Sequence, residues 1–534
     1  MSKNLFSGSR PETTNQFNQR KEFKSRKEDY AQSPSVYFCA YINMAKAAAK
    51  KREWPIILIA FLFMFFFGRI IGPFSVVTQV GSNILGVFIG VILLTVFTSQ
   101  STLASILGII AIVYSGFLDS TTAVSTWMGG STVPQLIFVS ALCVALKDAG
   151  VINVLVRKLL SIKLLRGHPV ALLFVLFFSS FIVSMFIGFI PTALLFFGIY
   201  ESIRDVCGYD KNDRFCKFTL LGIYLGCMGN FCFPFKGIAL TIYTLINTSM
   251  QGFGLNINMF TYIFFCVLVN FVWLAILSIM IPTVFKCNVT PLKDLDIENV
   301  SAIHAIPKKF DKRQLVILAI FCLSFLYIIV VPLLPQGFPG SAVLSPIGTT
   351  LIFLLALALL GLIQVGGKPL ANPMKLLSDG TLWNVVCIVG CFTFLGNAMA
   401  SADVGIRDWI IMLLKPVFGN IPLPVLLLLV TVVITVITNI CNGTPLTLLG
   451  NAAIMPFVCQ MQIDTGISAS VTAATLSLCA NMAFLTYAGT IYAALLLDRD
   501  EIDNRWIWTD AIKLIPVYIA VVYILSLACS YILP

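Results

Sequence analysis

Long apolar stretches, separated by short polar ones, make up most of the chain beyond residue 53. Segments such as 54–71, 315–334 and 508–533 reach the roughly 20 residues that an α-helix needs to cross a bilayer. They do not show the alternating ten-residue pattern of membrane barrel strands. The pattern therefore predicts an all-α polytopic membrane protein with about eleven transmembrane helices.

Two apolar stretches, 169–203 and 424–461, are broken near their middle by glycine and proline. The first carries GFIPT at Gly188–Thr192, and the second carries NGTP at Asn442–Pro445. Basic residues flank both ends of the first stretch, which places both ends on the cytoplasmic side. We expect each stretch to be a re-entrant hairpin. Small and polar residues also interrupt the segments 218–246 and 467–497, which predicts two discontinuous helices.

The second half of the chain repeats the first. Matching landmarks are Gly150 and Gly405, 255 positions apart, Pro191 and Pro445, 254 apart, and Asn230 and Asn481, 251 apart. Counting spans places the amphipathic helix after Gly150 on the inner face and the one after Gly405 on the outer face. The sequence thus predicts two inverted repeats, 83–285 and 314–534.

The remaining segments are polar connections and one further span. We expect a largely disordered cytoplasmic tail at 1–53, the first transmembrane helix with an outer loop at 54–82, and a cytoplasmic loop at 286–313. The tail contains eleven basic and five acidic side chains, a net charge of +6. Such a tail is typical of a positive-inside signal rather than of a nucleic-acid-binding arm, and it favours a cytoplasmic N-terminus in a plasma or inner membrane.

Composition excludes several classes of function. Hydrophobic residues make up 58% of the chain, charged residues 11%, and mean hydropathy is +0.94. The 15 cysteines lie singly in apolar segments without a CxxC pair, and the chain has only two histidines. These features argue against a metal centre. An intramembrane enzyme is also not expected, because the spans carry no Ser/His dyad or paired aspartates.

Broken helices expose backbone groups and small polar side chains inside a membrane, where they can replace the hydration shell of a solute. The breaks therefore supply the candidate site residues. The expected substrate-binding residues are Gly188, Pro191, Thr192, Lys236, Asn442, Gly443, Thr444, Pro445, Thr447 and Thr490. The expected ion-binding residues are Asn230, Gly237, Asn442, Asn481, Thr486 and Gly489.

From about Trp54 onward the chain resembles the divalent-anion:sodium symporter family, which carries dicarboxylates, citrate and sulfate. The resemblance depends on the order of elements, on VSMFIGFIPTALLFFG and TNICNGTPLTLLGNAAIMPF at the hairpins, and on the interrupted helices. It implies a scaffold with a mobile transport domain, an elevator mechanism and a homodimer. It also implies one sodium region at Gly188 and Asn230–Gly237 and another at Asn442–Thr444 and Asn481–Gly489.

Lys236 stands where the family would have a small residue, inside the apolar segment 218–246. We expect its ammonium to replace one sodium ion or to pair with a substrate carboxylate. Its nitrogen should lie within hydrogen-bond reach of break residues such as Asn230, Thr192 or the carbonyls near Gly188. The sequence thus predicts a secondary transporter of a small anion, most simply a di- or tricarboxylate, coupled to Na⁺ or H⁺ or working as an exchanger. No cofactor is expected beyond Na⁺, and no partner beyond the substrate, membrane lipids and a second copy. The alternatives are a cation/proton antiporter and an inorganic-anion permease for sulfate or an arsenite-like ion.

Overall fold

The computed structural model describes most of the chain from Trp54 to Leu533. The described residues are 54–98, 100–162, 165–295, 300–331, 347–418, 421–440, 443–487, 489–490 and 492–533. The expected tail 1–53 and the candidate residue Asn442 lie outside them. The chain divides into one unit at Met1–Leu58 and another at Ile59–Pro534, and every labelled helix belongs to the second.

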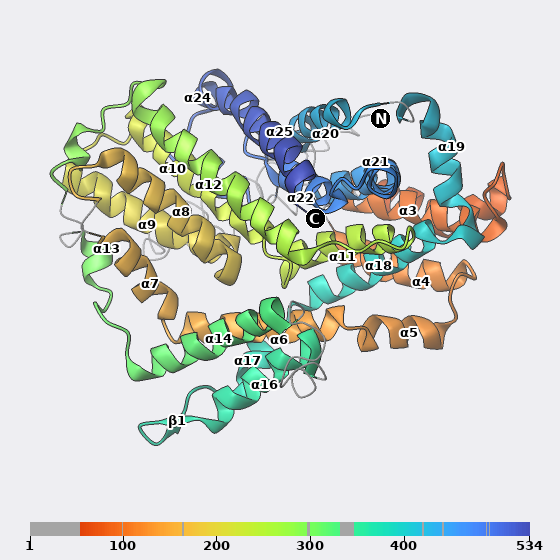
Figure 1. Cartoon of the computed structure of the whole chain (residues 1–534), viewed down its shortest axis with the longest axis horizontal. Coiled ribbons are helices and arrows are strands. Elements are labelled where there is room, and N and C mark those ends of the chain that lie inside the picture. Colours follow the sequence, from red (N-terminus) through yellow and green to blue (C-terminus); the bar gives the residue numbers. More distant parts are fainter. Residues whose placement is uncertain are drawn as a thin grey trace, which may run out of the picture. The chain divides into compact units, whose positions relative to one another are not determined.

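Helices form nearly all the regular structure of the described residues (Figure 1). Those of the first half are α3 (Gln79–Thr98), α4 (Ser101–Tyr114), α5 (Ser120–Gly129), α6 (Thr132–Asp148), α7 (Val151–Leu160), α8 (Pro169–Ile187), α9 (Phe189–Cys207), α10 (Arg214–Gly226), the 3-10 turn η2 (Cys227–Phe231), α11 (Gly237–Gln251) and α12 (Met259–Thr283). Those of the second half are α13 (Ser301–His304), α14 (Lys312–Val330), α16 (Gly348–Leu362), α17 (Pro373–Gly380), α18 (Trp383–Ala400), α19 (Ile406–Phe418), α20 (Leu423–Thr438), α21 (Gly443–Thr465), α22 (Ala469–Asn481), α23 (Ala494–Leu497), α24 (Asn504–Thr509) and α25 (Leu514–Ile532). Two short antiparallel strands, β1 (Gln364–Val365) and β2 (Lys368–Pro369), join α16 to α17.

Several helices are long and apolar enough to cross a membrane. Within the described residues, five pass by length and composition: Trp54–Ile71, Ser120–Asp148, Pro169–Ile187, Met259–Thr283 and Asn504–Ile532. The pair α17 and α18, bent by 62°, passes as a sixth. The eleven expected spans also include shorter apolar helices such as α3 and α4 and the two broken helices. The protein is an all-α polytopic membrane protein, as the sequence predicts.

The helix boundaries carry the same repeat as the sequence landmarks. α7 and α19 begin at Val151 and Ile406, 255 positions apart, and α10/α22 and α12/α25 have the same spacing. The hairpin pairs α8/α20 and α9/α21 begin 254 positions apart. Gly150 and Gly405, which precede α7 and α19, both have positive φ, 68° and 75°. The two halves thus place helices of the same kind in the same order.

The first hairpin is the pair α8 and α9, which run side by side (Figure 1). It packs against α10 and η2 through the glycines Gly222, Gly226 and Gly229, which recur at helical spacing. A Cβ built on Gly226 would lie 2.1 Å from Oγ of Ser180 and 2.5 Å from the carbonyl oxygen of Phe177. No larger residue fits there, and the close approach of the two backbones holds the hairpin on the broken helix.

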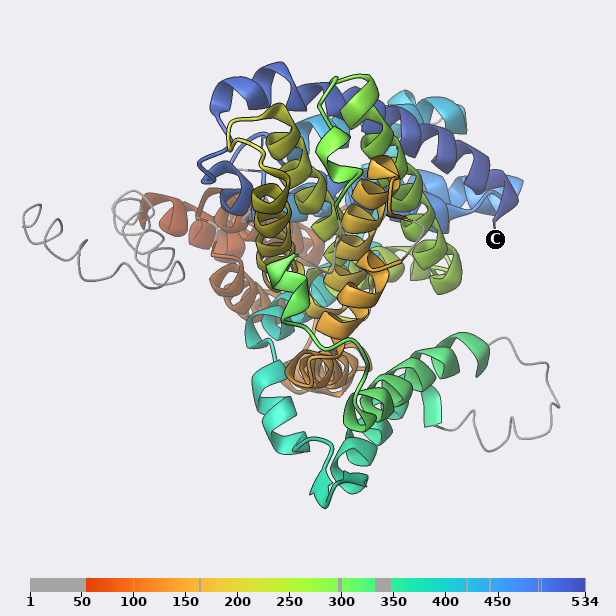
Figure 2. The same cartoon turned by 90° about the vertical axis from the view of Figure 1, so that its left-hand side faces the viewer.

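The second hairpin, α20 and α21, packs against α22 in a similar way. α12 contacts both α8 and α22, and so joins the two hairpin units. A second set of contacts joins α3, α4 and α18, and another joins α6 to α16 and α17. α14 packs against α16, and α14 is the green helix at the lower right of Figure 2. α11 contacts both α18 and α21, so it borders the hairpin units and the remaining helices.

Candidate functional site

The tip of the first hairpin is a single residue, Gly188, with φ 96° and ψ 172°. This backbone conformation favours glycine, because a side chain is strained at such a φ. The expected turn at Gly188–Thr192 is too long, since Pro191 and Thr192 already lie in the first turn of α9. Proline is tolerated there because the first N–H groups of a helix have no intrahelical partner.

The first broken helix stops at η2 and resumes at Gly237, leaving 232–236 without helical structure. Lys236 lies at the end of this gap in an extended conformation, with φ −151° and ψ 162°. Its ammonium donates a hydrogen bond to the carbonyl of Phe186, in the last turn of α8. The expected reach toward carbonyls near Gly188 is therefore confirmed, whereas among the described residues no hydrogen bond joins Lys236 to Asn230 or Thr192. Lys236 bridges the broken helix and the hairpin.

Lys236 is only 8% exposed. In the part of the chain that the structure describes, no carboxylate pairs with it, whereas Arg204, for comparison, is paired with Asp205 and Glu501. Burying an ammonium group away from water is costly unless a charge partner or several hydrogen bonds compensate it. The first break therefore contains a positive charge that is only partly compensated.

Asn230 lies beside the tip of the first hairpin. Its Oδ1 would be 3.8 Å from a Cβ built on Gly188, and its side chain is partly exposed. Among the described residues its amide makes no hydrogen bond, so its donor and acceptor are open to a ligand. The hydroxyl of Thr192, in contrast, donates to the carbonyl of Gly188 at 2.7 Å and closes the tip.

The second hairpin repeats part of this arrangement. The hydroxyl of Thr447 donates to the carbonyl of Gly443 at 2.9 Å, which is the counterpart of the bond from Thr192 to Gly188. Gly443 fits tightly, because a Cβ there would lie 1.7 Å from the carbonyl oxygen of Ala480. Gly443, Thr444 and Pro445 belong to the first turn of α21 and not to the turn itself, which contains Asn439.

Asn439 is the polar residue that sequence analysis missed. It is 2% exposed, and its Oδ1 accepts from the N–H groups of Phe484 and Leu485 at 3.0 and 3.1 Å. Its Nδ2 donates to the carbonyls of Thr435 and Met482, both at 2.9 Å. One side chain thus satisfies backbone groups of the second break and fixes that break to the hairpin. The signal was the first asparagine in TNICNGTP, three positions before Asn442.

The other residues expected in the second break are engaged within the protein. Asn481 donates to the carbonyl of Ser477 at 2.7 Å, and Thr486 donates to the carbonyl of Asn439 at 2.6 Å. Gly489 contacts the hairpin end, where a Cβ would lie 2.7 Å from the carbonyl oxygen of Thr438. Thr490 accepts a long hydrogen bond, 3.4 Å, from the N–H of Tyr492. The helix after the break is a single turn, α23, much shorter than its counterpart α11.

The structure brings the two breaks into contact. The hydroxyl of Tyr224 in α10 donates to the carbonyl of Ala483 in the second break at 2.9 Å. Phe189, next to the first hairpin tip, stacks on Tyr492 with ring centroids 4.3 Å apart and planes 8° apart. Groups that are some 260 to 300 positions apart in the chain therefore meet at one place, as inverted repeats of broken helices would require.

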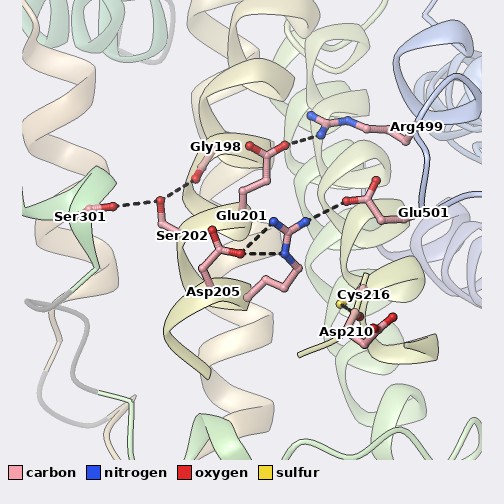
Figure 3. A network of polar contacts seen from close by, with 10 residues as sticks. Gly198, Glu201, Ser202, Asp205, Asp210, Cys216, Ser301, Arg499 and Glu501 are labelled. Carbon is pink, nitrogen blue, oxygen red and sulfur yellow. Dashed lines mark hydrogen bonds and ion pairs between the residues drawn. The ribbon is translucent and has the colours of Figure 1, made fainter. Parts of the chain in front are cut away.

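Ion pairs join the same two halves at the far end of α9 (Figure 3). Glu201 pairs with Arg499, and Arg204 pairs with Glu501 at 3.1 Å and with Asp205 at 2.8 Å. Arg204 and Glu501 are 11% and 5% exposed at their side chains. The segment that follows α23 is thus held to the second arm of the first hairpin, away from the helix breaks.

The chain is similar in structure to the YdaH transporter of Alcanivorax borkumensis. The two share 14% sequence identity, the match covers 77% of this chain and 87% of that one, and the TM-score is 0.48. No protein-family model matches the chain, and no curated protein sequence matches it. A likeness this distant transfers neither a substrate nor a mechanism, so the function has to come from the residues of the site.

Proposed function

We propose that this protein is a secondary active transporter of a small anion, with a di- or tricarboxylate as the preferred substrate. The observation that supports it is Lys236: a buried ammonium at a helix break, held by one backbone carbonyl and without a carboxylate partner among the described residues. Leaving a buried charge without its partner costs roughly 3–5 kcal/mol. An anionic substrate would remove that cost when it binds, so the break favours anions.

The surroundings of Lys236 support the same sign of charge. α9 and α11 both begin at the first break, at Phe189 and Gly237, and the N-terminal end of a helix carries a partial positive charge. Asn230 adds an open amide beside Gly188. Together these groups offer one full charge, two helix N-termini and an amide to a carboxylate, which accepts hydrogen bonds through both oxygens.

We propose that the coupling ion is Na⁺ or H⁺, or that the protein exchanges one anion for another. If Lys236 takes the place of one sodium ion, transport requires fewer sodium ions than the family norm. If Lys236 pairs with the substrate instead, sodium dependence is retained and substitution of Lys236 changes the substrate preference. An elevator mechanism in a homodimer, in a plasma or inner membrane with the N-terminus inside, completes the proposal.

A cation/proton antiporter is the second candidate, and it needs a buried carboxylate near mid-membrane. Among the described residues Glu501 is the one buried carboxylate, and it is paired with Arg204 beyond the end of α23. Neither described helix break contains an aspartate or glutamate. These observations favour the anion carrier. An inorganic-anion permease uses the same positive site, and substrate competition separates it from a carboxylate carrier.

Counterflow in proteoliposomes tests the proposal without knowledge of the driving ion. Vesicles are loaded with unlabelled di- and tricarboxylates, sulfate or phosphate, and the entry of the labelled compound is followed. We expect uptake of at least one carboxylate above that of empty vesicles, and a loss of about tenfold or more in Lys236→Ala, because 1.4 kcal/mol already corresponds to tenfold. The exposed Lys375→Ala is the matched control and should transport normally.

Two results would contradict the proposal. One is the absence of counterflow for every anion tested, together with collapse of a pH gradient on addition of Na⁺ or K⁺, which would indicate the antiporter. The other is normal uptake and normal sodium dependence in Lys236→Ala. Lys236→Arg refines the result, since a planar guanidinium cannot reproduce the compact charge of an ammonium. We expect that variant to be impaired or altered in selectivity.

A further inference from the structure

A pocket of about 330 Å³ lies between α6, α11 and α18, apart from the hairpin tips. Its volume corresponds to about ten water molecules at ~30 Å³ each. The end of α5, the start of α6, most of the length of α11 and the stretch 389–397 of α18 supply most of its lining. Contacts between α11 and α18 and between α11 and α6 enclose it.

The lining of this pocket is polar but uncharged. It includes Gln135, Thr244, Thr248 and Asn397, and none of its lining residues is acidic or basic. Within the described ranges, none of these four side chains makes a hydrogen bond. Gln135 and Thr248 are only 9% and 6% exposed, yet their side-chain polar atoms are not fully enclosed by protein. The remaining exposed surface of these side chains is therefore open to the pocket.

α11 turns one face toward the pocket along its whole length. Its lining residues are Leu240, Tyr243, Thr244, Asn247, Thr248 and Gln251, a spacing of three or four residues. Pro234, in the gap that holds Lys236, lines the same pocket, and Gln251 is the last residue of α11. At 1.5 Å per residue, the 15 residues of α11 span ~22 Å, so the pocket runs from the first break toward the membrane face where α11 ends.

Unpaired amides and hydroxyls are costly in a hydrocarbon environment, and they are found where water or a polar solute satisfies them. We infer that this pocket is the aqueous vestibule through which a small, hydrogen-bonding solute reaches the first helix break from the outside. The inference deepens the proposed function and rests on it for the charge of the solute. The lining binds the solute through neutral hydrogen bonds, and the charge of the solute is compensated only at Lys236. The outer side follows from the predicted topology, which places the start of α6 and the end of α11 outside.

Labelling of introduced cysteines tests the vestibule without any transport measurement. Thr244→Cys and Asn397→Cys are treated in proteoliposomes of known orientation with a membrane-impermeant thiol reagent. The control is Thr241→Cys on another face of α11, where Thr241 is 2% exposed and its hydroxyl donates to the carbonyl of Gly237. The unmodified protein reports the background from the natural cysteines. We expect both vestibule variants, and not the control, to react from the outside, with protection by the transported anion.

A second experiment tests the sign of the solute charge. Asn397→Asp keeps the size of the side chain and adds a negative charge, whereas Asn397→Ala removes only the hydrogen bonds. Two like charges about 10 Å apart in a medium of effective dielectric about 20 repel enough to lower binding roughly tenfold. We expect the Asp variant to raise the KM for the anion about tenfold with little change in kcat, and the Ala variant to raise it less. Gln135→Glu, in the part of the lining that α6 supplies, should behave like Asn397→Asp.

The outcomes separate the two proposals. If Thr244→Cys is labelled from outside but the protein transports no anion, the vestibule is supported and the proposed function is overturned. A different result would support the proposed function and overturn the vestibule. In that case the protein takes up the anion, the cysteine of Thr244→Cys does not react, and the KM is unchanged in Asn397→Asp and Gln135→Glu. Labelling from the inside alone would overturn the assignment to the outer face. A gain of uptake in Asn397→Asp would overturn the anionic charge of the solute.

Discussion

Replacement of Asn439 by leucine removes the side chain that joins the second break to its hairpin. Leucine has a similar volume, so the change creates little cavity and isolates the loss of hydrogen bonds. Three backbone groups lose a partner in the Leu variant: the N–H groups of Phe484 and Leu485 and the carbonyl of Met482. The carbonyl of Thr435 keeps its place in α20 and is affected less.

The size of the effect follows from these three groups. A buried donor or acceptor left without a partner costs about 1–3 kcal/mol. At about 1–2 kcal/mol for each group, the expected loss in the free energy of unfolding is about 3–6 kcal/mol. An unfolding entropy of about 2.1 cal/mol/K per residue over 534 residues gives ~1 °C per kcal/mol. We therefore expect Tm to fall by about 3–6 °C.

Thermal unfolding in detergent and counterflow at matched expression measure the result. Asn451→Leu is the matched control: Asn451 is also buried in the second hairpin, 3% exposed, but donates a single side-chain hydrogen bond, to Ser249 at 2.6 Å. That variant should lose only about 1 kcal/mol. We expect Asn439→Leu to unfold several degrees below Asn451→Leu and to lose uptake. Equal Tm values for the two variants would refute the role assigned to Asn439.

Two further predictions concern packing and pH. Gly226→Ala should disrupt the fold, because the new Cβ would lie 2.1 Å from Oγ of Ser180. The control Gly198→Ala has open space around it and should leave Tm unchanged. If the two variants behave equally in size-exclusion chromatography and in Tm, the close packing of α10 on α8 is contradicted. The hydrogen bond from Lys217 lowers the pKa of Asp503 below its ordinary value of 3.8, so the stabilisation is present above about pH 4 and is lost as pH falls through the lower folded-state pKa. Between pH 7 and pH 2.5, Asp503→Asn should lose less Tm than the unmodified protein, and parallel losses would show that this carboxylate does not contribute.

The sequence predicts the helical repeat well because its signals are local. Gly188 marks the tip of the first hairpin, since its φ of 96° favours glycine, and the expected hairpin starts at 169 and 424 fall within one residue of α8 and α20. The expected turns are too long because Pro191 and Pro445 were read as turn residues. Proline fits both a turn and the first turn of a helix, so its presence alone does not separate the two.

The site is predicted less completely, because its main contacts join distant parts of the chain. Asn439 bonds to Met482 and Phe484, more than 40 positions away, and no local pattern shows that its amide joins the hairpin to the second break. The polar face of α11 was visible as a period of three to four residues in YTLINTSMQ. The expected broken helix 218–246 ends inside this stretch, and only the packing of α6 and α18 against α11 reveals a pocket there.

Duplication and divergence explain why the two breaks differ. Both hairpins keep the same bond at their tips, from Thr192 to Gly188 and from Thr447 to Gly443. At the second break Asn439 satisfies the backbone internally, whereas at the first break Lys236 and Asn230 remain available to a ligand. One ammonium in one half gives the site a polarity that a symmetric pair of breaks would lack. Under the proposed function, a carboxylate substrate would therefore bind in one orientation, with one carboxylate toward the first half. The second carboxylate of a symmetric dicarboxylate would add no binding energy unless a coupling ion accompanied it.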